Sequence, residues 1–267
     1  MLILSTCWYK LNCKFNEDKY KVWIDNFLSN VKKFYLVVYT NQESCHILKK
    51  YENNTNIKIV ILELNEFYNY KYRASWIRNH EKNYLLKNKI CWEVNMLWSE
   101  KISFVKRTIE EKYFEGNWYG WCDIGYFRCA SNYELKKHEI INWPNNDKIK
   151  SFDKDKVYYG NVRNDSNNMK TLQAVVTNKN SNNLPIIPIS NNLWCIGGGF
   201  FIIHKDKINW WHDTYTNKLE LYFKNNYLVK DDQIIIVDCI FSDLSNFCIV
   251  QDTTISNPWF IFQRYLL

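Results

Sequence analysis

The chain has 267 residues, of which 46% are hydrophobic and 17% aromatic, and it carries a formal net charge of +7. This apolar content allows a sizeable core and excludes a mainly disordered chain. The lysines are interleaved with acids, which disfavours a dedicated nucleic-acid-binding protein. The mild excess of positive charge suits an anionic ligand such as a nucleotide diphosphate. Frequent Asn and Lys indicate an AT-rich coding genome, such as that of a large DNA virus or an AT-rich microbe.

No apolar run approaches the roughly 18 residues that span a bilayer, and the first residues lack the basic region of a signal peptide. We therefore expect a soluble, cytoplasmic protein, in the host cytoplasm if the source is viral. The nine cysteines include no C-x-x-C pair. Their spacing favours reduced thiols over a disulfide framework or a zinc site.

The N-terminal part alternates between apolar strands and helices. Apolar runs predict strands at residues 2–9, 34–40 and 57–64, and helical segments are predicted between them at residues 20–31 and 43–51. This alternation is typical of an α/β fold with a parallel sheet. Nucleotides bind at the carboxyl ends of such strands.

Two further helices are predicted at residues 76–87 and 93–112, followed by a strand at 118–122. Residues 142–192 are rich in Asn, Asp, Ser and Pro. They predict a loop-rich insertion over the sheet edge, with strands at "KVYYGNV" and "TLQAVVT".

The C-terminal part begins with the predicted strand "LWCIGGGFFIIHK". A helix at residues 208–225, a helix opened by "KDDQIIIVDCIF" and a strand "NFCIV" follow. No repeat or linker interrupts the chain, so we expect one domain. Its nucleotide-binding half covers about 1–129, its loop-rich insertion about 130–190, and its acceptor and catalytic half about 191–267.

Asp123 lies where the apolar strand "WYGWC" ends, in the stretch "WCDIGYFR". A carboxylate there faces the ligand crevice of an α/β sheet and suits Mg²⁺ or Mn²⁺ bridging a diphosphate. Gly125 would let a sugar or phosphate approach closely, and Arg128 offers a fork for phosphate. The alternative is a simple turn at Asp123 and Gly125 with a solvated Arg128.

Gly197, Gly198 and Gly199 interrupt an otherwise strong strand. Glycines there mark a bulge or a close backbone approach, which predicts either a flat floor under a ligand or tight packing of the strand on a helix. Their spacing fits neither a P-loop nor a dinucleotide fingerprint.

Asp231 and Asp232 precede Gln233 at a predicted helix start. Such a pair can serve as general base or bind the hydroxyls of a transferring sugar, and helix capping is the alternative. Lys101 can neutralise phosphate or lie solvated on its helix. Thr6 and Tyr9, at the end of the first strand, are candidates to contact a base or ribose.

The order of these features resembles the HtrL/YibB family, a group of glycosyltransferases with a GT-A fold. The matching stretches are "ILSTCWYK … YKVWIDNFLSN", "LWSEKISFVKRTI" before "WYGWCDIGYFR", and "WCIGGGFFIIHKDKINWW" before "DDQIIIVDCIF". The resemblance covers most of the chain and is weakest at about residues 130–190.

The resemblance implies a single Rossmann-like GT-A domain and a role for each motif. Asp123 would take the Asp-x-Asp-like position that meets the donor's ribose or metal, and Lys101 would face the donor diphosphate. The three glycines would lie beneath donor sugar and acceptor, and Asp231–Asp232–Gln233 beside the transferring sugar. Gly125 replaces the family's second acid, which puts metal dependence in doubt, and Asp252 is the candidate to substitute as a ligand.

We therefore expect a glycosyltransferase that uses a UDP- or GDP-linked sugar, a glycan or glycoprotein acceptor, and Mn²⁺ or Mg²⁺. Asp232, or Asp231 beside it, would be the base of an inverting reaction or would stabilise an oxocarbenium-like sugar in a retaining one. The alternative is a catalytically silent, lectin-like module that binds a nucleotide-sugar or glycan, and the missing second acid favours it.

Overall fold

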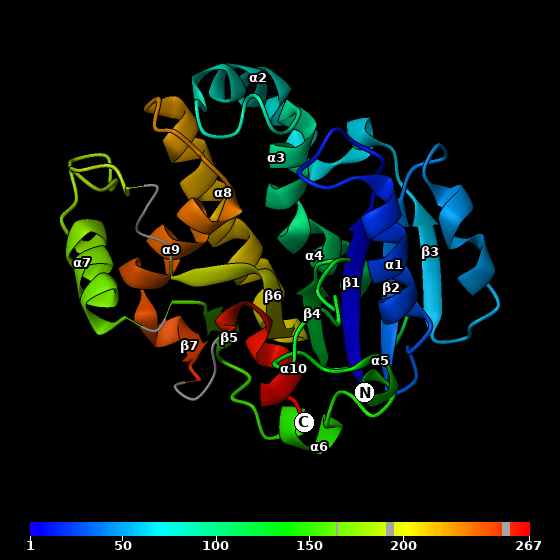
Figure 1. The fold of residues 1–267 in the computed structure, drawn as a ribbon. Helices are drawn as coiled ribbons and strands as arrows, with labels where there is room; N and C mark the ends of the chain where they lie inside the picture. Colours follow the sequence, from blue (N-terminus) through cyan, green and yellow to red (C-terminus); the bar gives the residue numbers. More distant parts are fainter. Residues whose placement is uncertain (164, 191–194, 253–256) are drawn as a thin grey trace.

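The computed structural model describes residues 1–163, 165–190, 195–252 and 257–267. Within these residues, a seven-stranded sheet runs through the molecule in the order β3-β2-β1-β4-β6-β5-β7 (Figure 1). The strands are β1 (Leu2–Trp8), β2 (Phe34–Thr40), β3 (Ile57–Ile61), β4 (Trp118–Cys122), β5 (Val157–Asn161), β6 (Ile196–His204) and β7 (Phe247–Val250). Only β6 runs antiparallel to its neighbours, β4 and β5, so the sheet is mostly parallel, as predicted.

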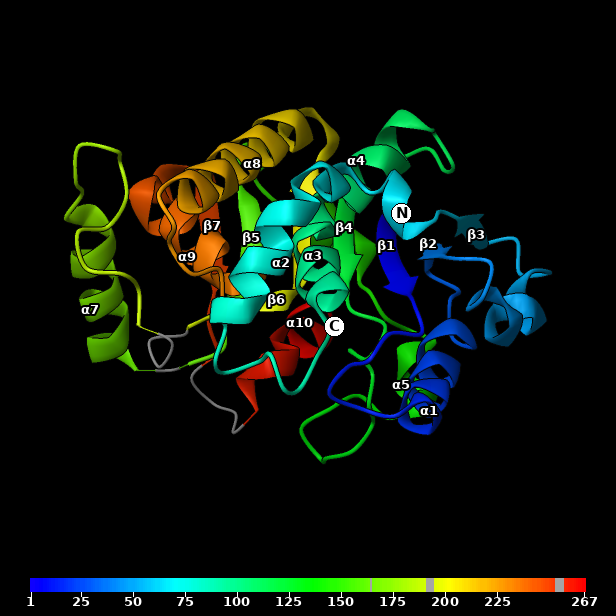
Figure 2. The same cartoon turned by 90° about the horizontal axis from the view of Figure 1, so that it is seen from above.

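Helices cover both faces of the sheet (Figure 2). The α-helices are α1 (Glu17–Leu28), α2 (Arg73–Lys82), α3 (Trp92–Ser99), α4 (Lys101–Glu110), α5 (Lys137–Ile140), α6 (Asn146–Lys150), α7 (Ser166–Thr177), α8 (Ile208–Lys224), α9 (Asp232–Ser242) and α10 (Ile261–Tyr265). The 3₁₀ segments are η1 (Cys45–Tyr51), η2 (Leu64–Glu66), η3 (Tyr68–Tyr72), η4 (Lys205–Lys207), η5 (Leu244–Asn246) and η6 (Pro258–Phe260).

The sheet separates two hydrophobic cores because successive strand residues point to opposite faces. In β1, Ile3 packs in the core formed with α3, α4, α8 and α9. Its neighbours Leu2 and Leu4 pack in the core formed with α1, α5 and α10. A strand buried on both faces is mostly apolar, and β1 is apolar apart from its buried Ser5 and Thr6.

Three sequence predictions in the middle of the chain are wrong. "TLQAVVT" belongs to helix α7, because Asp165 caps the helix by accepting the backbone N–H groups of Asn167 and Asn168, and Leu172 and Val176 share one buried face. The predicted strand "KVYYGNV" exists as β5, but it lies inside the sheet between β6 and β7 and not over the sheet edge. The single helix predicted at 93–112 is two helices, α3 and α4.

The predicted strand from residue 193 begins at Ile196, and its first two positions lie outside the described residues. All nine cysteines are free thiols, as their spacing predicts. Among the described helices, none combines the length and the apolar character that crossing a membrane requires.

Candidate functional site

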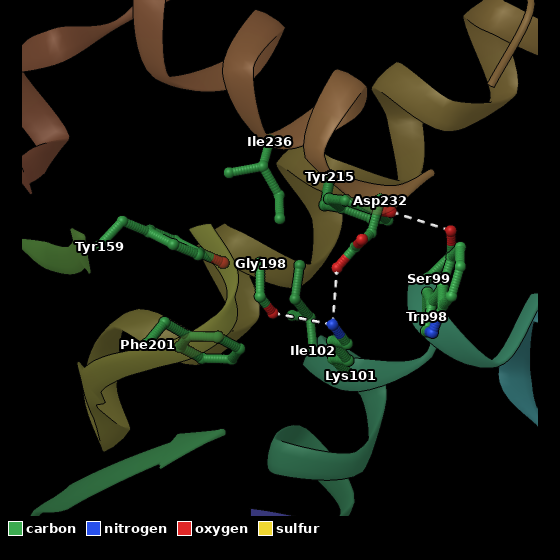
Figure 3. Close-up of a pocket in the computed structure, with 10 residues that line it drawn as sticks. All are labelled: Trp98, Ser99, Lys101, Ile102, Tyr159, Gly198, Phe201, Tyr215, Asp232 and Ile236. Atoms are coloured by element: carbon green, nitrogen blue, oxygen red, sulfur yellow. Dashed lines mark hydrogen bonds and ion pairs between the residues drawn. The ribbon is translucent and has the colours of Figure 1, made fainter. Parts of the chain in front are cut away.

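Lys101 joins three parts of the fold at one point (Figure 3). Its Nζ lies 3.2 Å from Asp123 Oδ1. It lies 3.0 Å from Asp232 Oδ2, and Figure 3 draws this second ion pair. It also donates a hydrogen bond of 2.8 Å to the carbonyl of Gly198. The structure therefore brings together four residues that the sequence singled out, from α4, the end of β4, the start of α9 and β6.

Glu100 sets the position of Lys101 by separating α3 from α4. The Glu100 carboxylate is buried and accepts the backbone N–H groups of Tyr68 and Asn69, at 2.7 and 3.0 Å, and the side-chain amide of Asn69 at 2.7 Å. Burial raises the pKa of this carboxyl to about 7, although these hydrogen bonds oppose the shift. Lys101 therefore begins a new helix with its side chain aimed at the sheet.

Asp123 follows β4 at the edge of the sheet where the parallel strands β1 and β4 end. Its backbone N–H bonds to the Gly199 carbonyl at 2.8 Å, which continues the pairing of β4 with β6. The indole N–H of Trp121 donates to Asp123 Oδ1 at 2.6 Å, and this hydrogen bond fixes the orientation of the carboxylate. The Asp123 side chain remains 42% exposed and can meet a ligand.

The glycines of β6 provide room for both acids. The pairing of β5 with β6 shifts here, from Tyr159 opposite Phe201 to Gly160 opposite Gly197. Residues 198–200 of β6 therefore have no partner in β5. A Cβ at Gly198 would lie 2.6 Å from Asp232 Oδ2, and one at Gly199 would lie 3.2 Å from Asp123 Oδ2. The carboxylates of Asp232 and Asp123 thus occupy the space that side chains at Gly198 and Gly199 would need.

Three asparagines that the sequence analysis did not single out hold the segment before α9. Asn79 Nδ2 donates to the carbonyl of Val229 at 2.8 Å, and its Oδ1 accepts the Val229 N–H at 2.9 Å. Asn83 and Asn95 donate to the carbonyl of Lys230, at 3.0 and 3.2 Å. Asn79 lies on α2 and Asn83 directly follows the end of this helix, and their spacing of four residues is the signal that was available.

Asp231 and Asp232 stand at the start of α9, but neither caps it through its side chain. Asp231 occupies the cap position without a side-chain hydrogen bond to the helix. Its Oδ2 lies 3.3 Å from Lys230 Nζ, whereas its buried Oδ1 has no hydrogen-bond partner. A buried acceptor without a partner is costly unless a ligand or water satisfies it.

The charges of the cluster depend on burial and on one another. Burial raises the pKa of Asp232 to about 6, with the charge of Asp231 adding to the shift and that of Lys101 opposing it. Burial disfavours the charge of Lys101, but the carboxylates of Asp123 and Asp232 outweigh it and raise the pKa of the lysine above its ordinary value. At neutral pH the Lys101 ammonium therefore lies beside an Asp232 side chain that is largely ionised.

A small cavity lies behind Lys101 and Asp232 (Figure 3). Its volume is about 10 Å³, which is close to the minimum for one water molecule. Tyr215, on its wall, donates to Ser99 Oγ at 3.0 Å. The inner wall of the site is thus closely packed, and a ligand of sugar size has to approach from the exposed side of Asp123.

Gly125 and Arg128 contact an aromatic cluster. A Cβ at Gly125 would lie 2.8 Å from the ring of Trp23. The Arg128 guanidinium lies 4.5 Å from the centre of a Trp23 ring, and its Nε donates to the Gly125 carbonyl at 3.0 Å. Both residues thus shape the turn after Asp123.

The remaining predicted site residues lie in different surroundings. Thr6 is fully buried and its hydroxyl has no hydrogen-bond partner, whereas Tyr9 is buried and donates to the carbonyl of Leu62 at 2.9 Å. Gln233 is half-buried in the first turn of α9. Asp252 pairs with Arg264 at 3.3 Å.

The residues present do not fit a divalent cation held by Asp123 and its neighbours. Hard cations need several oxygen ligands, and the Lys101 ammonium already lies between the carboxylates of Asp123 and Asp232. The Asp252 carboxylate is engaged by Arg264. In the described part of the chain, no group of three or more Asp, Glu, His or Cys side chains is placed to hold a metal ion.

No family model and no curated protein matches the chain. Among solved structures, the chain is similar to the galactosyltransferase LgtC in complex with donor and acceptor sugar analogues. The likeness has a TM-score of 0.47 at 10% sequence identity and covers 93% of this chain and 73% of that one. A likeness at this level carries no argument about the substrate or mechanism of this chain.

Proposed function

We propose that the chain is a GT-A glycosyltransferase that transfers a sugar from a UDP- or GDP-linked donor to a hydroxyl of a glycan or glycoprotein. The observation that carries the proposal is the ammonium of Lys101 held between Asp123 and Asp232 at the carboxyl edge of the sheet. Ligands of open α/β sheets bind at this edge. The ordered motifs that resemble the HtrL/YibB family support the same activity.

The two sides of the site suit the two parts of such a donor. Asp123 is partly exposed and fixed by Trp121, so it can accept a hydrogen bond from a ribose hydroxyl. The unsatisfied Oδ1 of Asp231 can accept one from a hydroxyl of the transferring sugar. Burying an unmatched acceptor favours a ligand that supplies the missing donor.

In the transfer, the bond between the anomeric carbon and the diphosphate oxygen breaks, and its electron pair leaves with the diphosphate. The acceptor oxygen forms the new bond and gives up its proton. Because the pKa of Asp232 is about 6, this carboxylate is largely ionised at neutral pH. Either it or Asp231 takes the proton in an inverting reaction. In a retaining one, the pair stabilises an oxocarbenium-like sugar and the departing diphosphate takes the proton.

Turnover of a panel of UDP- and GDP-sugars, with glycan acceptors and with and without Mn²⁺, tests this function. We expect Asp123→Ala to abolish turnover and leave the protein folded. Asp18→Ala is the matched control, because Asp18 is an exposed acid on α1. Full activity of Asp123→Ala would contradict the proposal, and donor binding without turnover under any condition would favour the silent binding module.

A further inference from the structure

We infer that the chain binds the donor diphosphate with two lysines at the rim of the site, Lys14 and Lys230, and without a bridging metal ion. This inference rests on the proposed function and concerns the leaving group of that reaction. The acids of the site do not fit a divalent cation, because the Lys101 ammonium lies between two of them.

Lys101 neutralises the acids but has no donor left for a phosphate. An ammonium group has three N–H donors. Three acceptors surround Nζ, namely the carboxylates of Asp123 and Asp232 and the carbonyl of Gly198. Because the side chain is also buried, Lys101 acts as a fixed counter-ion, and other residues have to contact the diphosphate.

Lys230 directly precedes the acid pair, and its position is fixed by hydrogen bonds to its backbone. Its backbone carbonyl accepts hydrogen bonds from Asn83 and Asn95, and its Nζ lies 3.3 Å from Asp231 Oδ2. The side chain thus lies beside the carboxylate whose other oxygen has no hydrogen-bond partner. This position suits a cation that holds a phosphate next to the transferring sugar.

Lys14 approaches the same place from the loop that follows β1. Its Nζ lies 4.9 Å from the centre of a Trp98 ring, and Trp98 lines the cavity behind Lys101. The loop is anchored by the bond from Cys91 N–H to the carbonyl of Asn12, at 3.0 Å. Burial lowers the pKa of Lys14; the charge of Asp231 opposes this shift and that of Lys230 adds to it.

The charge balance of the site explains why these lysines suffice. Three lysines, at positions 14, 101 and 230, face three carboxylates, at positions 123, 231 and 232. A divalent cation at a diphosphate site offsets the repulsion between acids and phosphates. Here three protein ammonium groups offset the charge of the three acids, so a diphosphate does not meet a net negative site, and Lys14 and Lys230 can contact phosphate while they neutralise the acids.

The experiment measures binding of UDP and GDP to the full chain by calorimetry, in EDTA and in Mn²⁺. We expect at least one of them to bind in EDTA within about threefold of its affinity in Mn²⁺. Lys14→Met and Lys230→Met should each weaken binding about tenfold, because each removes a charge-assisted contact. Lys14→Arg should keep most of the affinity, and Lys10→Met, in the same loop but paired with Glu17, should leave it unchanged.

Inorganic pyrophosphate identifies the part of the ligand that the lysines contact. It lacks base and ribose, so Lys14→Met and Lys230→Met should weaken its binding by the same factor. Loss of UDP affinity with unchanged pyrophosphate affinity would overturn the inference. A tenfold or greater requirement for Mn²⁺ would overturn it too, while leaving the proposed function intact.

The remaining outcomes separate the two proposals. Metal-free diphosphate binding that depends on both lysines, without sugar transfer from any donor, would support the inference and refute the proposed function. Absence of binding to all three ligands, with and without Mn²⁺, would refute both.

Discussion

Substituting Gly198 by alanine tests whether the acid cluster requires a residue without a side chain at this position of β6. The new Cβ would lie 2.6 Å from Asp232 Oδ2 and 3.1 Å from its Cγ. Such contacts are not sustained below 3.0 Å, so the carboxylate has to move by at least 0.4 Å. It moves away from the glycine strand, and its contact with Lys101, now 3.0 Å, has to change.

We expect Gly198→Ala to lower kcat about 10- to 100-fold, because a displacement of about 1 Å costs about 100-fold and this carboxylate has to move by at least 0.4 Å. Overpacking should also cost about 1–3 kcal/mol of unfolding free energy. Gly160→Ala is the matched control, since its Cβ would meet an Ile261 methyl group at the same 2.6 Å, away from the acids. The assay is turnover of a UDP- or GDP-sugar, with stability measured by urea denaturation.

The two variants separate a defect of the site from a defect of stability. Gly160→Ala should lose stability to a similar extent and keep its turnover per folded molecule. If Gly198→Ala turned over donor at the wild-type rate, the position of Asp232 against β6 would be irrelevant to function. Equal loss of turnover in both variants would likewise refute the reasoning, because it would trace the effect to packing of the sheet.

Three further predictions concern the same region. The folded pKa of Asp232, about 6, lies above the ordinary value, so the folded state binds this proton more tightly and the unfolding free energy falls as pH rises from about 4 to about 6. Asp232→Asn should remove this fall, on the order of 3 kcal/mol, and leave the separate fall that Glu100 causes up to about pH 7. A urea–pH profile unchanged by the substitution would contradict this prediction. Asn79→Ala removes both hydrogen bonds to the Val229 backbone and should lower the unfolding free energy by about 2–3 kcal/mol in urea, whereas a loss below about 0.5 kcal/mol would show that water replaces them. Trp121→Phe removes the N–H that orients the Asp123 carboxylate and should lower kcat/KM about tenfold, and an unchanged value would show that Lys101 alone positions the carboxylate.

Strands were predictable where burial on both faces favours a mostly apolar run. β1, β2 and β4 therefore match their predictions closely. The same rule failed for residues 171–177, because the β-branched run there is also the buried face of α7. A short apolar run does not tell a buried strand from a buried helix face, and only the partners of Leu172 and Val176 decide between them.

The break between α3 and α4 was hidden for a different reason. Residues 93–112 show helical spacing throughout, and Glu100 is a good helix former. In the structure its carboxylate is buried against the backbone of Tyr68 and Asn69, from a segment about 30 residues earlier. A contact over that separation leaves no local pattern in the sequence.

The sequence by itself determined which residues could form a site: an acid at the end of a strand, three adjacent glycines, an acid pair before a helix and a lysine on the preceding helix. Local chemistry sets these choices, because strand ends, glycines and helix starts have preferences that act over a few residues. Only the tertiary structure decided that Lys101 lies between Asp123 and Asp232 and that Gly198 faces one of these acids. Those contacts join residues about 20 to 130 positions apart, and they form only because β4, β6, α4 and α9 pack around one edge of the sheet.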